Sequence, residues 1–181
     1  MRTSNSVKNS ITSAVSYVIA IVIGLIAQAL FIKILGTEYL GLNGLFSNIL
    51  TMLSIFDLGI GSAIVYNLYK PIANENKEEV KSLMLFYKKA YNLIALIIFC
   101  GGLLVIPFLK KIVGEITIDV NLYIVYILFL LNTVFSYLMT YKRSLIIANQ
   151  KNYIINIVHI IYLLIINISR LILLYLSRVF F

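Results

Sequence analysis

Apolar residues gather into five long stretches that are separated by short polar segments. These stretches cover approximately residues 11–35, 42–69, 80–109, 121–147 and 153–178. Each is at least as long as the ~20 residues that an α-helix needs to cross ~30 Å of hydrocarbon. The pattern therefore predicts an all-α integral membrane protein with five transmembrane helices, which form a single transmembrane domain over residues 1–181.

The second stretch differs from the others because its polar and small residues share one side. When successive residues are placed ~100° apart, as in an α-helix, an arc of roughly 140° holds Asn43, Gly44, Ser47, Thr51, Ser54, Asp57, Gly61 and Ser62. The remaining side is apolar and carries Phe46, Ile49, Leu50, Leu53, Phe56 and Ile60. Polar groups are unfavourable against hydrocarbon, so we expect this polar stripe to face protein or water. The second span is thus predicted to border an interior.

Asp57 is the only acidic residue deep within a predicted span. An ionised and unpaired carboxylate in the middle of a membrane is unfavourable by about 3 kcal/mol, which favours a functional role. The alternative is structural, with Asp57 hydrogen-bonded to Ser54, Ser62 or a neighbouring helix. Sequence alone leaves both interpretations open.

Polar residues also share one side of the first, fourth and fifth stretches. The first carries Ser13, Tyr17, Ala20, Gly24 and Gln28, and the fourth carries Asn132, Ser136, Thr140 and Ser144. On the fifth, an arc of roughly 80° holds Asn156, His159, Asn167 and Arg170. Small and polar residues either let helices pack closely or line a cavity. Arg170 either binds a diphosphate or extends to the headgroups, and His159 is either a proton relay or a packed side chain.

Several residues predict where the helices begin, end or bend. Asn76 and Glu79 have the spacing of a helix N-terminal capping pair, and Pro71 is expected to end the helix before it. Asp119 is a candidate cap for the fourth span. The start of the third helix is expected to lie at the membrane interface with Lys81, Tyr87, Lys88, Lys89 and Tyr91, and its end is expected to kink or pack closely at Gly101, Gly102 and Pro107.

The composition and the charge agree with a membrane protein. The chain is 61% hydrophobic and its mean hydropathy is +0.99. Its net charge of +8 comes from lysines and arginines between the apolar stretches, so we expect the lipid bilayer as a partner and no nucleic acid. With the N-terminus inside, ten basic residues lie in cytoplasmic segments and four in outer segments. This asymmetry predicts a cytoplasmic N-terminus.

Catalytic and metal-binding patterns are missing from the sequence. The single cysteine, Cys100, excludes an internal disulfide and a cysteine metal cluster. The chain contains no Walker A loop, HExxH, GxSxG or CxxC pattern. The sequence therefore predicts neither an enzyme nor a cofactor or metal site.

Four segments of the chain resemble a known transporter family. In order they are LGTEYLGLNGLF, LSIFDLGIGSAIVYNLYKPIA, SLMLFYKKAYNLI and NTVFSYLMTYKRSLIIANQKNYI. They resemble the polysaccharide flippases, of the O-antigen and capsule type, in the multidrug/oligosaccharidyl-lipid/polysaccharide exporter superfamily. The resemblance extends from Arg2 to Tyr153 and is most specific between Leu35 and Ala73. It implies alternating access and the flipping of undecaprenyl-diphosphate-linked oligosaccharide across the bacterial inner membrane for cell-surface polysaccharide biosynthesis.

The resemblance also bears on completeness and on the cavity. Members of the family have two six-helix halves, so we expect this chain to be an N-terminal part that needs a C-terminal half or self-association. A cation-coupled multidrug exporter of the same superfamily, or a non-functional truncated transporter fragment, is the alternative. The residues expected to line the substrate cavity are Gln28, Asn43, Ser47, Thr51, Ser54, Asp57, Asn156, His159 and Arg170.

Overall fold

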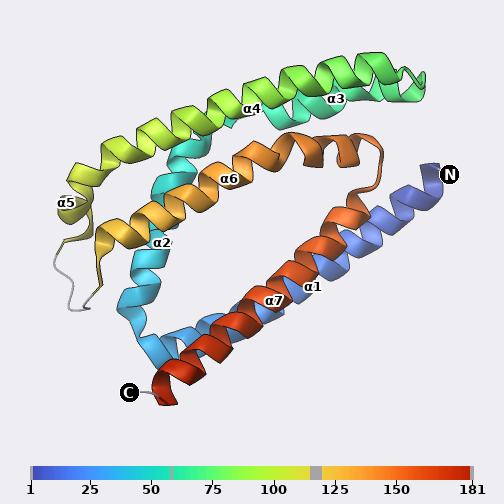
Figure 1. The fold of residues 1–181 in the computed structure, drawn as a ribbon. Helices are drawn as coiled ribbons and strands as arrows, with labels where there is room; N and C mark the ends of the chain where they lie inside the picture. The colour runs from blue at the N-terminus through green and yellow to red at the C-terminus, as the bar shows by residue number, and fades with distance from the viewer. Residues whose placement is uncertain (1, 58, 115–119, 180–181) are drawn as a thin grey trace. The chain divides into compact units, whose positions relative to one another are not determined.

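The computed structural model describes residues 2–57, 59–114 and 120–179, and every regular element in them is helical. In chain order these are α1 (Arg2–Leu35), α2 (Thr37–Leu53), the 3₁₀ helix η1 (Ser54–Asp57), α3 (Ile60–Ala73), α4 (Lys77–Val105), the 3₁₀ helix η2 (Ile106–Phe108), α5 (Leu109–Val113), α6 (Leu122–Ala148) and α7 (Asn152–Val179). The prediction of an all-α protein is therefore confirmed for the described residues (Figure 1).

Among the described residues, four helical segments are long and apolar enough to cross a membrane: Asn5–Leu35, Lys77–Val113, Leu122–Ala148 and Asn152–Arg170. The chain is therefore a multi-pass membrane protein. The second predicted span is absent from this set because it is not one continuous helix. It consists of α2, η1 and α3, with a break between Asp57 and Ile60. The expectation of an unbroken helix over residues 42–69 is wrong.

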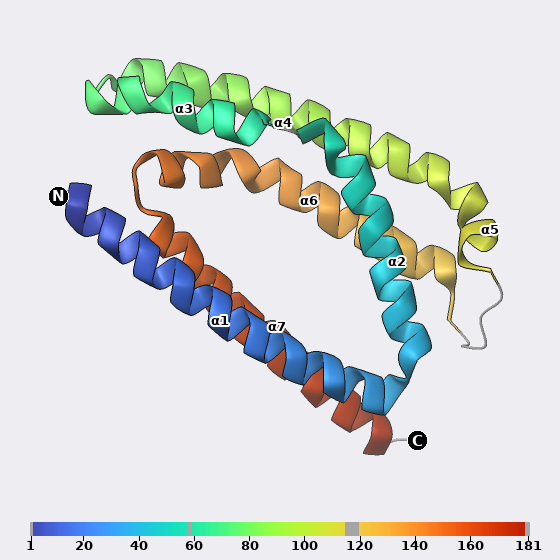
Figure 2. The same cartoon turned by 180° about the vertical axis from the view of Figure 1, so that it is seen from behind.

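The chain divides into two compact units, which are described separately. The first comprises Met1–Thr37 and Gln150–Phe181, and the second comprises Glu38–Asn149. In the first unit α1 and α7 lie side by side along most of their length (Figures 1 and 2). They run parallel, because polar contacts join the beginning of α1 to the beginning of α7. The predicted single domain stays a prediction.

Side-chain hydrogen bonds join α1 to α7 near the N-termini of the two helices. The Asn9 amide donates to the Gln150 carbonyl at 2.9 Å, and its oxygen accepts from the Tyr153 backbone N–H at 2.9 Å. The Asn156 amide donates to the Ser13 hydroxyl oxygen at 2.9 Å. Side-chain amides are effective links between membrane helices because lipid offers them no partner.

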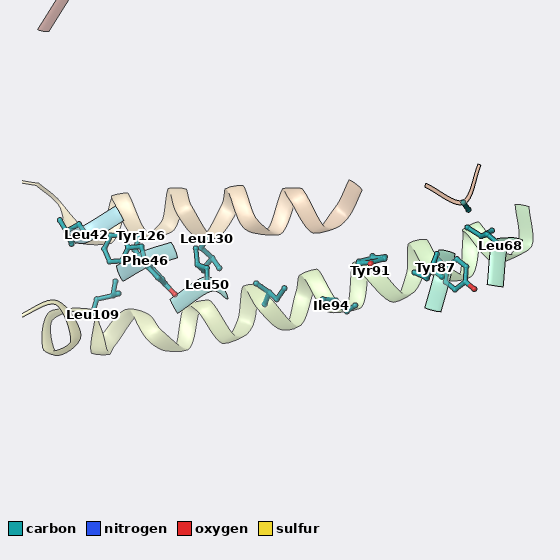
Figure 3. Close-up of a cluster of buried hydrophobic side chains, with 13 residues drawn as sticks. Leu42, Phe46, Leu50, Leu68, Tyr87, Tyr91, Ile94, Leu109, Tyr126 and Leu130 are labelled. Atoms are coloured by element: carbon teal, nitrogen blue, oxygen red, sulfur yellow. The ribbon is translucent and has the colours of Figure 1, made fainter. Parts of the chain in front are cut away.

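The second unit has one apolar core, built mainly by α6 packed on α4 and on α3. The core also receives the apolar side of α2, where Phe46 is fully buried and meets Tyr126 and Phe129 edge to face, with ring centroids 5.4 and 5.8 Å apart (Figure 3). Phe46 was predicted on the apolar side of this span. The side chain of Phe56, predicted on the same side, lies outside the described residues.

α4 packs unusually close to α6 at Gly102. A Cβ atom there would overlap the side chain of Leu130, and the Gly102 carbonyl accepts a hydrogen bond from the buried Tyr126 hydroxyl at 3.1 Å. The helix then changes to the 3₁₀ segment η2, which contains Pro107. Of the two alternatives predicted for this region, a kink or close packing, close packing is found at Gly102.

The other predicted helix ends are partly corrected. Asn76 caps α4 by accepting from the Glu79 N–H at 3.1 Å, and its amide reaches the Glu79 carboxylate at 3.0 Å. The carboxylate thus binds the capping side chain, where we expected it to reach the backbone. Pro71 does not end α3, which continues to Ala73, and the Asn74 N–H still donates to the Lys70 carbonyl at 3.0 Å. The cap of α6 is Asn121, while Asp119 lies outside the described residues.

Candidate functional site: a helix break with a carboxylate and a tyrosine

The second predicted span breaks at Gly59. Gly59 has φ 82° and ψ −13°, a left-handed conformation that side chains with a Cβ rarely adopt, and it precedes the first residue of α3. No side chain among the described residues caps this helix start. Instead the Gly59 carbonyl accepts from the Ala63 N–H at 3.0 Å and from the Ser62 hydroxyl at 2.8 Å. The break leaves the first backbone N–H groups of α3 without partners inside that helix.

Asp57 is the last residue before this break that belongs to a helix. Its carboxyl atom Oδ1 is buried, yet it has no hydrogen-bond partner in the part of the chain that the structure describes. Asp57 was predicted as the single carboxylate of the polar stripe, and the structure places it at the end of the 3₁₀ helix η1. Of the structural alternatives, hydrogen bonds to Ser54 and Ser62 are not formed, because both hydroxyls donate to backbone carbonyls. The third alternative, a partner on a neighbouring helix, is met by the Tyr91 hydroxyl of α4, which lies within hydrogen-bonding reach of the carboxylate.

Tyr91 of α4 faces the same place. Its side chain is completely buried, and its hydroxyl has no hydrogen-bond partner of good geometry among the described residues. The hydroxyl lies close enough to Asp57 for the two groups to interact electrostatically. It also lies 3.3 Å from the position that a Cβ on Gly61 would occupy. The absence of a side chain at Gly61 therefore admits the Tyr91 hydroxyl to the first turn of α3.

The sequence singled out Tyr91 only as a residue of the membrane interface, together with Tyr87, and gave it no place in the site. Both rings are buried in the second unit. The signal was present in the spacing of Tyr87, Tyr91, Ile94 and Ile98, which recur every three or four residues and form the buried side of α4. The neighbouring Lys88 and Lys89, which suggested the interface, lie on the exposed side of the same turns.

The rest of the polar stripe lies beside the core of the second unit. Asn43, Ser54, Asp57 and Gly61 are half-buried, whereas Gly44, Ser47, Thr51 and Ser62 are exposed. The hydroxyls of Thr51 and Ser54 donate to carbonyls one turn earlier, at 2.8 Å each. These hydroxyls are satisfied within their own helix and keep their oxygen lone pairs as acceptors. Asp57 is the acidic group of the stripe. Its buried oxygen Oδ1 has no hydrogen bond of good geometry among the described residues, and the Tyr91 hydroxyl lies beside the carboxylate.

No family model matches this chain, and neither a curated protein nor a solved structure does.

Within the described residues, no group of three or more His, Cys, Asp and Glu side chains is arranged to hold a metal ion. Cys100 is a free, exposed thiol. The chemistry at the break therefore involves one carboxylate, one phenolic hydroxyl and the backbone groups of a broken helix.

The remaining predicted cavity residues lie in the first unit and are not one cluster. Asn156 is turned toward α1, where it binds Ser13, so its amide links two helices. Gln28, His159 and Arg170 are exposed. Asn167, which shares their predicted arc, donates its amide to the Leu163 carbonyl at 2.7 Å. Gly24 on α1 has open space at its Cβ position, so close packing does not explain that glycine.

Proposed function

We propose that the chain forms part of the path of a membrane transporter that flips undecaprenyl-diphosphate-linked oligosaccharide for cell-surface polysaccharide biosynthesis. The proposal combines the resemblance of the Leu35–Ala73 region to polysaccharide flippases with one structural observation. That observation is the polar stripe, which lies outside the core of its own unit, with Ser47, Thr51 and Ser62 exposed. In a membrane such a surface has to face water, a polar substrate or other protein.

The polar character of the stripe suits a sugar-diphosphate head. Hydroxyl oxygens of Ser47, Thr51 and Ser62 offer several neutral hydrogen-bonding positions without fixed charge, which favours a substrate that slides along them. The prenyl tail of the substrate would remain in lipid. On this proposal the protein lies in the bacterial inner membrane with a cytoplasmic N-terminus, catalyses no reaction, and needs further helices or a second copy to complete the path.

Thiol labelling of single-cysteine variants tests this role. In a Cys100→Ala background, Thr51→Cys places a thiol on the stripe, and Met52→Cys places one at a neighbouring residue that is 76% exposed but lies off the stripe. A hydrophilic thiol reagent needs water at the thiol, so we expect Thr51→Cys to react and Met52→Cys to remain unlabelled. Added lipid-linked oligosaccharide should then slow labelling at Thr51→Cys by about tenfold, equivalent to ~1.4 kcal/mol of protection.

Three outcomes would redirect the proposal. Equal labelling of the two positions would contradict the claim that the stripe faces water. If lipid-linked oligosaccharide leaves the labelling of Thr51→Cys unchanged, this lipid is not the substrate that contacts the stripe. Protection by lipophilic drug cations, with none by the lipid-linked oligosaccharide, favours the multidrug exporter alternative.

A further inference from the structure

We propose that the exposed face of α4 binds the headgroup of an anionic phospholipid, with the Lys88 and Lys89 ammonium groups and the Asn92 amide as its ligands. The occupant is a lipid of the bilayer and not the transported substrate, so the inference goes beyond the proposed function. Three observations carry it: the depth of these residues in a membrane, the side of the helix that they share, and the absence of partners for them among the described residues.

The length of the uncharged part of the helical segment Lys77–Val113 fixes the depth. Residues 90–109 carry no charged side chain, whereas Lys88 and Lys89 precede them and Lys110 and Lys111 follow them. At ~1.5 Å per residue the uncharged part spans ~30 Å, which is the thickness of the hydrocarbon. Lys88 and Lys89 therefore lie at the boundary between hydrocarbon and headgroups, and Asn92 lies about one helical turn inside it.

The three residues share the side of α4 that lies away from the core. When successive residues are placed ~100° apart, an arc of roughly 120° begins with Lys88, Lys89 and Asn92 and continues toward the bilayer centre with the exposed residues Leu96, Cys100 and Leu103. Nearly opposite this arc is the buried side of α4, which carries Tyr87, Tyr91, Ile94 and Ile98. A lipid whose headgroup binds at the lysines can thus lay its acyl chains along an apolar strip of the same helix.

The polar side chains of this face are unpaired. Within the part of the chain that the structure describes, neither lysine forms an ion pair, and the Asn92 amide forms no hydrogen bond. Glu78 is on the same arc but lies about three helical turns earlier, and Asp57 lies beside Tyr91 on the buried side. An amide without a partner is unfavourable against hydrocarbon, and lysines at the boundary extend toward the headgroups. We therefore expect the partner of all three groups to come from the lipid.

The charge of this face favours an anionic lipid over a zwitterionic one. Each basic residue near an anionic membrane surface raises binding about fivefold. In phosphatidylcholine the headgroup carries its own cation, which neutralises the phosphate and repels the lysines. Phosphatidylglycerol lacks this cation, so its phosphate can bind both ammonium groups. The Asn92 amide adds a neutral donor for a phosphate or ester oxygen.

The experiment uses Cys100, the single cysteine of the chain, because it is exposed on the same arc. A fluorophore on Cys100 lies ~16 Å from Lys89 toward the bilayer centre, so a nitroxide near the end of an acyl chain quenches it when that lipid occupies the face. The full chain is reconstituted in phosphatidylcholine vesicles that contain nitroxide-labelled phosphatidylglycerol or nitroxide-labelled phosphatidylcholine. The two quenching curves give the preference for the anionic headgroup. We expect a preference of about 25-fold for the wild type and about fivefold after Lys88→Gln or Lys89→Gln.

Two other lysines provide matched controls. Lys77→Gln removes an exposed lysine of the same helix that lies ~18 Å beyond Lys89, more than a Debye length away, so the preference should change by less than about twofold. Lys142→Gln removes an exposed lysine of α6 at a similar depth, because Tyr137 of α6 packs beside Tyr91 of α4. This variant should also change the preference by less than about twofold, since its charge belongs to another helix.

Asn92→Leu distinguishes a lipid ligand from a residue that only faces hydrocarbon. Leucine suits hydrocarbon better than asparagine, so without a headgroup contact this substitution would stabilise the protein and leave the preference unchanged. Loss of a hydrogen bond to the lipid should instead lower the preference about fivefold.

Four results would overturn the proposal. Equal quenching by the two lipids would show that the face has no preference for an anionic headgroup, and no quenching by either lipid would show that protein covers it. An effect of Lys142→Gln as large as that of Lys88→Gln would indicate a general surface charge instead of a site. Displacement of the quenching lipid by lipid-linked oligosaccharide, but not by unlabelled phosphatidylglycerol, would assign the face to the transported substrate. Thiol protection at Thr51→Cys is measured on α2, so the proposed function is tested separately.

Discussion

Asn9 of α1 caps the first turn of α7 through Tyr153, whose backbone N–H donates to the Asn9 side-chain oxygen at 2.9 Å. The other side-chain atom of Asn9 donates to the Gln150 carbonyl at 2.9 Å. A helix start normally has a cap from its own chain segment, one residue before the helix. Here the cap comes from a residue more than 140 positions earlier in the sequence. This contact joins the N-terminal part of α1 to the start of α7.

Asn9→Ala should therefore destabilise the protein more than an ordinary polar substitution on α1. We expect the free energy of unfolding to fall by about 1–2 kcal/mol, the usual effect of losing a helix cap. The measurement is SDS-induced unfolding of the purified chain in mixed micelles. Asn5→Ala, one turn earlier on α1, is the matched control and should change the value by less than about 0.5 kcal/mol. Equal effects of the two variants would contradict the capping role.

Close packing of α4 on α6 makes a second prediction. A methyl group at Gly102 would overlap Leu130, so Gly102→Ala should lower the free energy of unfolding by about 1–3 kcal/mol. Combining it with Leu130→Ala should give a smaller loss than the sum of the two single losses, because the shortened side chain makes room for the new methyl group. Gly101→Ala, which meets Leu53 at 3.3 Å, should have a milder effect. Simple additivity would show that the two residues do not share this contact.

Local signals in the sequence predicted local features of the fold. Asn76 and Glu79 lie within one helical turn, so their capping interaction depends on few other residues, and the structure contains it. The close approach at Gly102 was one of the two alternatives that the adjacent glycines suggested, the other being a kink. Pro71 misled the prediction of a helix end, since a proline near the last turn removes only one backbone donor and the helix continued to Ala73.

The candidate site could be predicted only in part. The spacing of polar residues identified Asp57 and the stripe around it. The break at Gly59 could not be predicted, because a glycine between apolar residues is compatible with both a packed helix and a left-handed turn. Tyr91 was missed because its role depends on α4 lying against α3, which is a tertiary contact. Asn156 appeared to belong to a cavity face, and only the parallel pairing of α1 and α7 reveals its bond to Ser13.

The orientation of the chain makes a third prediction, which follows from the ten-to-four asymmetry of basic residues. In a Cys100→Ala background, cysteines at Asn74 and Asn149 should be shielded from an impermeant thiol reagent in intact cells. A cysteine at Lys111 should react. All three positions are exposed in the structure, so differences in labelling report the side of the membrane. Permeabilised cells provide the control, since all three thiols should then react. The reverse pattern in intact cells would reverse the orientation.

The last prediction concerns the break at Gly59. Whether Gly59→Ala lowers or raises the stability distinguishes the observed broken span from the continuous helix that the sequence suggests. Gly59 has φ 82°, where a residue with a Cβ is unfavourable by about 1–2 kcal/mol, so Gly59→Ala should destabilise the protein by that amount. In a continuous helix the same substitution would stabilise it by about 1 kcal/mol, because alanine is the better helix former.

Two further substitutions control for the effect of size. Gly59→Asn should be tolerated better than Gly59→Ala even though asparagine is larger, because asparagine adopts the left-handed conformation more readily than most residues. Gly44→Ala, in the regular part of α2 with no other described atom within 4 Å of the new methyl group, should stabilise the chain by about 0.5–1 kcal/mol. Unfolding in mixed micelles gives all three values under the same conditions. If Gly59→Ala and Gly44→Ala stabilise equally, α2 and α3 form one continuous helix.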